Sequence, residues 1–148
     1  MDFTYFTEIL SMTSQKKQPS PQLESLLLAY CKNIDTWADS WEIGGKDQKT
    51  GEAIVEEFKL FLINRIEKGR AKKTIKNCAN YLWVLGGELI RRVNDDESER
   101  RLTVRKLILK YVDESGGPYW RHAHDESDHA RYDSVCRQLF KFMMADSV

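Results

Sequence analysis

Apolar residues recur at helical spacing through most of this chain. The segment 55–66 carries one apolar residue every three or four positions, at Val55, Phe58, Leu62 and Ile66. The segment 75–93 repeats the pattern at Ile75, Ala79, Leu82, Gly86, Leu89 and Val93. This spacing places each set on one face of an α-helix, and no alternation of apolar and polar residues continues long enough for a β-strand. The pattern predicts an all-α protein.

The N-terminal part of the chain divides into an arm and a helix. Residues 1–21 are predicted to form an N-terminal arm and linker, with helical spacing at Phe3, Phe6 and Leu10. This arm either covers the core of its own chain or is exchanged with a neighbouring subunit. Ser20 followed by Pro21 favours a helix start, because serine is a good N-cap and proline fits the first helical position. The apolar face of that helix is expected at Leu23, Leu27, Tyr30, Ile34 and Trp37.

Turn and capping residues set the later boundaries. Thr50 is the expected N-cap of a second helix, which ends at Gly69. Thr103 is expected to cap a fourth helix that runs to about Glu114, before the Ser-Gly-Gly-Pro sequence at 115–118. A last helix would bury Tyr132, Val135, Cys136, Leu139, Phe140 and Met143. Residues 22–146 therefore predict a single domain, a compact bundle of about five helices.

Positive charge is concentrated around Gly69. The chain has 23 Lys and Arg residues against 23 Asp and Glu residues, so its formal net charge is zero. Between Arg65 and Arg92, however, eight basic residues accompany two acids. Such a local excess is typical of a surface that meets phosphates. The predicted DNA-binding residues are Lys68, Arg70, Lys72, Lys73, Thr74 and Lys76.

A second basic group could extend this surface. Its members are Arg91, Arg92, Arg100, Arg101, Arg105 and Lys106. The acids in the segment 95–99 could equally neutralise it.

The order of these motifs resembles the core-binding domain of tyrosine recombinases and phage integrases. The resemblance covers about residues 54–144 and rests on the apolar helix at 58–62, Glu67-Lys68-Gly69, Lys73-Thr74-Ile75 and Tyr81-Leu82. The segments 102–112 and 132–143 are similar to the family's third and last helices. The resemblance implies a SAM-like helical fold that holds duplex DNA through its phosphate backbone. A homodimer or a recombinase is a further possible partner.

The resemblance implies no catalysis, because the family's reactive residues belong to a second domain for which this chain has no room. None of the histidines is followed by arginine three positions later, as the family's active site requires, and His129 precedes Arg131 at the wrong spacing. Tyr132 is therefore not expected to be a nucleophile. We expect a protein that is not an enzyme and has no cofactor.

Histidine and cysteine residues do not predict a metal site. The three histidines lie between Trp120 and Arg131, without the spacing of a helical ligand pair, at His122, His124 and His129. Nearby acids are expected in the first turn of the last helix, where they complement its dipole, at Asp125, Glu126 and Asp128. The cysteines are widely separated and are expected to be small buried residues at Cys31, Cys78 and Cys136.

Gly86 and Gly87 interrupt an otherwise regular helical pattern. Each glycine costs about 1 kcal/mol relative to alanine in a helix. We therefore predict that Gly86 touches the backbone of another helix; the alternative is that exposed backbone meets a phosphate or a partner.

Most aromatic residues are expected in the core, at Trp37, Trp41, Phe58, Phe61, Tyr81 and Trp83. Tyr119-Trp120-Arg121 is the aromatic and basic cluster expected to be exposed.

Two functions remain open from the sequence. One is a non-catalytic DNA-binding protein. The other is a protein-interaction or dimerisation module of the same fold, which net neutrality and a pI near 6.8 favour. A metal-dependent enzyme would rest on the histidine segment alone. The apolar runs are shorter than the roughly 18 residues that span a bilayer, and the N-terminus lacks a signal-like pattern, so a cytoplasmic location without membrane association is expected.

Overall fold

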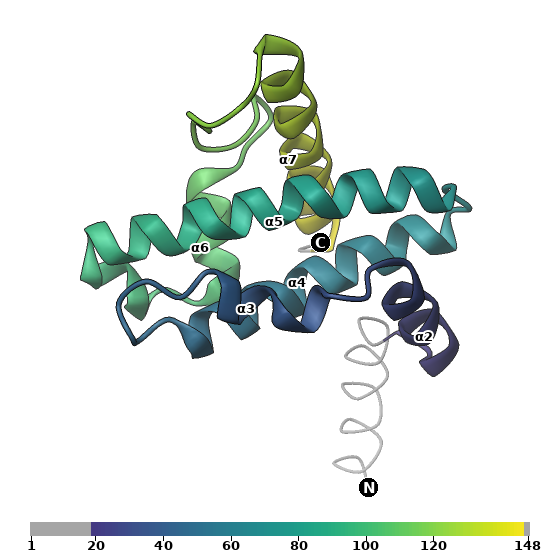
Figure 1. The fold of residues 1–148 in the computed structure, drawn as a ribbon, viewed down its shortest axis with the longest axis horizontal. Coiled ribbons are helices and arrows are strands. Elements are labelled where there is room, and N and C mark those ends of the chain that lie inside the picture. Colours follow the sequence, from purple (N-terminus) through teal and green to yellow (C-terminus); the bar gives the residue numbers. More distant parts are fainter. Residues whose placement is uncertain (1–18, 147–148) are drawn as a thin grey trace, which may run out of the picture.

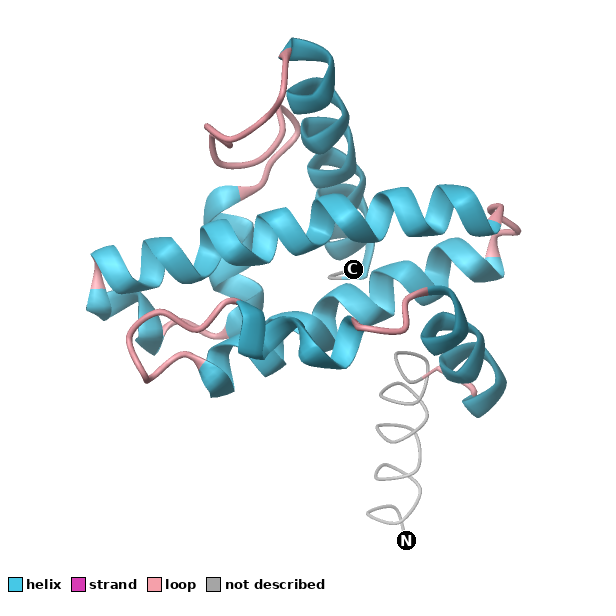
Figure 2. Ribbon diagram, viewed as in Figure 1, coloured by secondary structure: helices cyan, strands magenta, loops and turns pink. Residues whose placement is uncertain are grey.

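Two long antiparallel helices form the centre of the structure (Figure 1). The computed structural model describes residues 19–146, and within that range it contains helices but no β-strand (Figure 2). The predicted all-α class is confirmed. The central pair is α4 (Gln48–Glu67) and α5 (Lys72–Asp95). The elements around it are α2 (Pro21–Tyr30), η1 (Ile34–Thr36), α3 (Trp37–Ser40), η2 (Glu97–Arg101), α6 (Val104–Tyr111) and α7 (Glu126–Asp146).

One hydrophobic core joins these elements. Helix α4 packs against α2, α3, α5, α6 and α7, and α5 packs against α7 on another side. The predicted stripes of α4 and α5 point into this core, where Phe58, Leu62, Leu82 and Leu89 are fully buried. Helix α7 adds its predicted face, of which Phe140 is only partly buried. Burial of these stripes, rather than helix propensity, stabilises the long helices.

The first predicted helix is correct at its start and wrong at its end. The hydroxyl of Ser20 accepts a hydrogen bond from the N–H of Leu23 (3.2 Å), and Pro21 is the first residue of α2. The helix stops at Tyr30 instead of continuing to Trp37, and the backbone at Cys31 is no longer helical. The chain then turns so that η1 and α3 can bury Ile34 and Trp37 against the core.

Two other predicted caps had different outcomes. Thr103 is confirmed, since its hydroxyl accepts a hydrogen bond from the N–H of Lys106 (3.2 Å) at the start of α6. That helix ends at Tyr111, earlier than Glu114. Thr50 is not a cap, because α4 begins two residues earlier, at Gln48, and Thr50 lies in its first turn.

Gly86 is buried, but its close neighbour is a side chain and not a helix backbone. A Cβ atom placed on Gly86 would lie 2.1 Å from Cζ2 of Trp41. The Trp41 indole N–H donates to the carbonyl of Trp83 (3.0 Å), which fixes the ring across α5. A Cβ on Gly87 would lie 3.5 Å from the same ring, an ordinary contact. The predicted close approach is confirmed, and the predicted partner is corrected.

The expectations for Trp83 and Cys31 need correction, and the expectation for the N-terminal arm lies outside the described residues. Trp83 was expected in the core and is 44% exposed, because it lies one position beyond the buried stripe of α5. Cys78 and Cys136 are buried as predicted, whereas Cys31 is only partly buried. The predicted arm falls almost entirely within residues 1–18, which are outside the described residues. Across residues 19–146, no helix has the length and apolar character needed to cross a membrane.

Candidate nucleic-acid interface

The turn between α4 and α5 is fixed by backbone hydrogen bonds. Gly69 has a φ of +81°, a left-handed conformation that glycine adopts without strain. The N–H of Gly69 donates to the carbonyl of Ile66 (2.9 Å), and the N–H of Arg70 donates to the carbonyl of Arg65 (3.1 Å). This pair of bonds is the Schellman motif that closes many helices. Lys68 and Arg70 therefore project from a defined backbone.

Helix α5 begins directly after this turn, and its first turn is suited to an anion. Ala71 occupies the N-cap position and has no side-chain oxygen to bond the first N–H groups. These N–H groups lie at the positive end of a 24-residue helix, which favours a phosphate oxygen. The side chain of Thr74 is exposed in the same first turn and supplies a hydroxyl donor.

The predicted cations surround this helix start. We refer to residues 68–76 as the basic turn, which forms one end of the α4–α5 hairpin (Figure 1). Its basic side chains are all exposed: Lys68, Arg70, Lys72, Lys73 and Lys76. None of them forms an ion pair with an acid of the described range 19–146. Lys72 has its Nζ 5.6 Å from the ring centre of Tyr30, which links the basic turn to α2. Its charges are thus available to an outside anion.

A polar strip continues from the basic turn along α5. A depression of about 510 Å³ is lined by three lysines and two amides: Lys72, Lys73, Lys76, Asn77 and Asn80. Asn77 and Asn80 also line a groove of about 780 Å³ that contains Trp83, Trp120 and Arg131. Sequence reasoning missed the two asparagines and expected Trp83 in the core. The signal for the asparagines was spacing, because each lies four residues beyond a lysine and shares its helix face.

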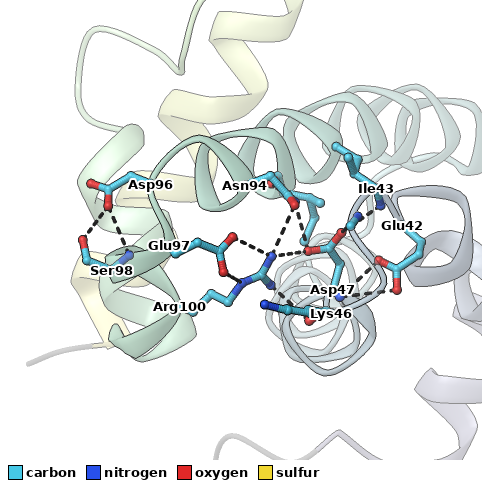
Figure 3. A network of polar contacts seen from close by, with 11 residues as sticks. Glu42, Ile43, Lys46, Asp47, Asn94, Asp96, Glu97, Ser98 and Arg100 are labelled. Carbon is cyan, nitrogen blue, oxygen red and sulfur yellow. Dashed lines mark hydrogen bonds and ion pairs between the residues drawn. The ribbon is translucent and has the colours of Figure 1, made fainter.

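Four of the six members of the second basic group are tied into the fold, whereas Arg101 and Lys106 are exposed. At the other end of the hairpin, Arg100 of η2 forms a 2.9 Å ion pair with the fully buried Asp47 (Figure 3). Arg100 also pairs with Glu97 (2.8 Å) and donates to the carbonyl of Lys46 (3.0 Å). Asn94 donates its amide N–H to Asp47 (3.0 Å), so the network joins the end of α5 to the loop before α4.

The carboxylate of Asp47 is held ionised by its neighbours. Burial alone would raise its pKa, but the N–H groups of Ile43 (2.8 Å) and Gly44 (3.1 Å), together with Arg100, hold the pKa well below its usual range. Three other members of the second basic group are also engaged. Arg91 lies 3.8 Å from Glu88, Arg92 lies over the ring of Tyr111, and Arg105 donates to the carbonyl of Met143.

His129 has a structural role at the start of α7. Its Nδ1 lies 3.1 Å from the Asp133 carboxylate, and its Nε2 accepts a hydrogen bond from the N–H of Trp120 (3.1 Å). Because Nε2 accepts this hydrogen bond, the ring in this geometry is the neutral tautomer with its proton on Nδ1. Glu126 and Asp128 lie in the first turn of α7, as predicted from the helix dipole. In the part of the chain that the structure describes, no three His, Cys, Asp or Glu side chains form a group that could hold a metal ion.

Tyr132 is enclosed in the core. It is 0% exposed, and its hydroxyl donates to the carbonyl of Pro118 (2.8 Å). Burial raises the pKa of Tyr132 far above its ordinary value. This hydroxyl cannot reach a substrate in the folded protein.

The basic turn offers ammonium, guanidinium, hydroxyl and N–H donors, which together can bind anions. Comparisons with models of known protein families, with curated proteins and with solved structures gave no match to this chain.

Proposed function

We propose that this protein is a non-catalytic DNA-binding module that contacts the phosphates of duplex DNA through the basic turn. The observation that carries the proposal is the set of exposed cations on a hydrogen-bonded turn, none paired with a described acid. Because the backbone of the turn is already held in one shape, it loses little backbone freedom when it meets a row of phosphates. The first turn of α5 adds N–H donors directed at the same anions.

The proposal includes an architecture like that of the recombinase core-binding domain. A helical hairpin that ends in a basic turn, followed by a short helix and a final long helix, is the order that the resemblance implies. Two observations support the absence of catalysis. The Tyr132 hydroxyl is buried, and both ring nitrogens of His129 already have hydrogen-bond partners. A cytoplasmic location is part of the proposal and agrees with three unpaired cysteines.

The salt dependence of DNA binding tests this function. Fluorescence anisotropy would measure the affinity for a labelled duplex of mixed sequence between 50 and 200 mM salt. Each neutralised phosphate contributes a slope of about −0.9 to a plot of log affinity against log salt, so five cations that each neutralise one phosphate predict a slope of about −4.5. The double variant Lys72→Glu/Lys73→Glu is expected to abolish binding.

A matched control separates the basic turn from net charge. Lys46→Glu/Lys49→Glu makes the same change in charge at exposed positions near the other end of α4. This variant should bind DNA nearly as well as the wild type at 100 mM salt. Equal losses in both variants would mean non-specific attraction, and no binding by the wild type at low salt would reject the proposal.

A second candidate function is a protein-interaction or dimerisation module of the same fold. The observation that favours it is the groove along α5, where Trp83 is 44% exposed beside Trp37 and Trp120. Exposed aromatic side chains are enriched where proteins meet. Sedimentation equilibrium of the wild type and Trp83→Ala tests the homodimer, which predicts a dimer that the substitution weakens. A wild-type monomer at high concentration would contradict self-association.

A further inference from the structure

A small pocket behind the basic turn has three arginines at its rim. Its volume is about 220 Å³, and it lies between the end of α4, the start of α5 and the middle of α7. Its lining includes Arg65 near the end of α4, Arg70 in the turn before α5 and Arg131 of α7, and none of the lining residues is acidic. We call it the three-arginine pocket. Its other polar lining includes Thr74 and Asn77, and its apolar lining includes Ile75, Cys78 and Val135.

Arg65 is poorly satisfied within the fold. Its guanidinium lies over the ring of Phe61, 4.7 Å from the centre, and its Nε is buried without a hydrogen-bond acceptor among the described residues. Burial lowers the pKa of Arg65, and the positive charge of Arg70 lowers it further. No acid of the described range forms an ion pair with this guanidinium, and an anion in the pocket would supply the missing counter-charge.

Asp128 interacts electrostatically with Arg131 but does not supply a counter-charge inside the pocket. Asp128 is outside the pocket, where it accepts hydrogen bonds from the hydroxyl of Tyr81 (2.7 Å) and the N–H of His124 (3.2 Å). The carboxylate therefore has partners of its own. The pocket keeps an excess of positive charge at its rim.

We propose that the three-arginine pocket binds a phosphate group. Guanidinium groups bind phosphate oxygens in pairs, and three of them around one opening suit a tetrahedral anion with several acceptor oxygens better than a planar carboxylate. Thr74, in the first turn of α5, adds a hydroxyl donor to the lining. The phosphate comes from a nucleic-acid strand or from a small phosphorylated molecule. The pocket shares Arg70 and Thr74 with the basic turn, whereas Arg65 and Arg131 belong to the pocket alone, so phosphate binding can be tested separately from duplex binding.

The test begins with inorganic phosphate and the intact protein. Thermal melts are recorded in rising phosphate and in sodium chloride of equal ionic strength, and isothermal titration calorimetry measures the affinity. Phosphate is expected to raise Tm by several degrees and to saturate, because a ligand that binds the folded state stabilises it. An equal rise in chloride, or no saturable heat, would overturn the proposal.

Two substitutions and a control locate the site. Arg131→Gln changes an exposed side chain and should weaken phosphate binding at least ten-fold without loss of fold. Arg65→Gln should do the same, and its circular dichroism spectrum would show that the fold is intact. Arg121→Gln removes an equal charge at an exposed position outside the pocket and should leave the affinity unchanged. Wild-type affinity in the Arg131→Gln variant would overturn the assignment.

The source of the phosphate is found with two further probes. Tighter binding of a 5′-phosphorylated duplex than of its 5′-hydroxyl counterpart, lost in Arg131→Gln, would identify a strand end. Binding of a mononucleotide with no difference between the two duplexes would identify a small molecule, and failure of every phosphorylated probe to bind would reject the pocket. Lys72→Glu/Lys73→Glu should remove duplex binding but still bind inorganic phosphate. The two measurements therefore distinguish a failure of the DNA proposal from a failure of the pocket proposal.

Discussion

The indole of Trp41 lies across the backbone of Gly86, where a side chain would otherwise be. A Cβ atom on Gly86 would be 2.1 Å from Cζ2 of the ring and 2.3 Å from Cη2. The ring cannot swing away freely, because its N–H is bonded to the Trp83 carbonyl and its edge packs against Phe58. Helix α5 therefore tolerates a glycine of low helix propensity because α3 packs at that point.

Substitution of Gly86 by alanine should destabilise the protein. The added methyl group clashes with Trp41, and overpacking of this kind costs about 1 to 3 kcal/mol of unfolding free energy. Gly87→Ala is the control, since its Cβ would make an ordinary 3.5 Å contact and alanine favours the helix by about 1 kcal/mol. Urea denaturation of both variants measures the difference. A Gly86→Ala protein as stable as the wild type would contradict the close-packing account.

The Asp47 network predicts a stability that depends on pH. At pH 7, Asp47→Asn should lower the unfolding free energy by about 2 kcal/mol, because a buried carboxylate with several donors is replaced by a neutral amide. The folded-state pKa of Asp47 lies below the unfolded value of about 3.9, so its contribution is present above that pH and is lost as the pH falls through the folded-state pKa.

Urea denaturation at pH 7 and at pH 3 tests this expectation. The difference between wild type and Asp47→Asn should be smaller at the lower pH. Asp95→Asn, at an exposed position nearby, should show little effect at either pH. A difference that grows as the pH falls would reverse the sign and refute the assignment.

Loss of the His129 side chain should weaken the start of α7. His129→Ala removes the acceptor of the Trp120 N–H and a partner of Asp133, at a cost of about 1 to 2 kcal/mol. His122→Ala, at an exposed position, should be nearly neutral. Thermal melts of the two variants compare them. A smaller effect at His129 than at His122 would mean that the imidazole bonds contribute nothing.

A comparison of two threonines tests the helix boundaries. Thr103→Ala removes the hydroxyl that accepts from Lys106 and should cost about 1 kcal/mol. Thr50→Ala should be neutral or slightly stabilising, because Thr50 lies inside α4 and alanine is the better helix former. Chemical denaturation would measure both. A larger loss at Thr50 would show that its hydroxyl has a role other than capping.

Local signals predicted much of the fold. Ser20 and Thr103 act as caps because their hydroxyls bond N–H groups three residues away, a relationship that the sequence shows directly. The buried faces of α4 and α5 could also be predicted, because apolar residues three or four positions apart lie on one face of a helix. The predicted cap at Thr50 was wrong because α4 starts directly after Asp47, whose carboxylate accepts a hydrogen bond from the distant Asn94.

Long-range pairing limited the rest. The end of α2 after Tyr30 could not be predicted, because no glycine or proline marks it and the apolar spacing continues through Ile34. The choice of Trp41 as neighbour of Gly86 depends on how α3 docks, which helical periodicity does not contain. For the candidate site, clustered lysines were visible in the sequence, whereas the position of Arg131 beside Arg65 required the packing of α7.

The uneven distribution of charge gives the molecule a direction. Cations are unbalanced at the basic turn, while Arg100 at the other end of the hairpin is balanced by Asp47 and Glu97. If the proposed contacts with phosphates form, a polyanion would attract the end of the hairpin at the basic turn more strongly than the end at Arg100, although the net charge of the chain is zero. At physiological salt this attraction would act within about 8 Å, so it would orient the protein only in the last step of approach.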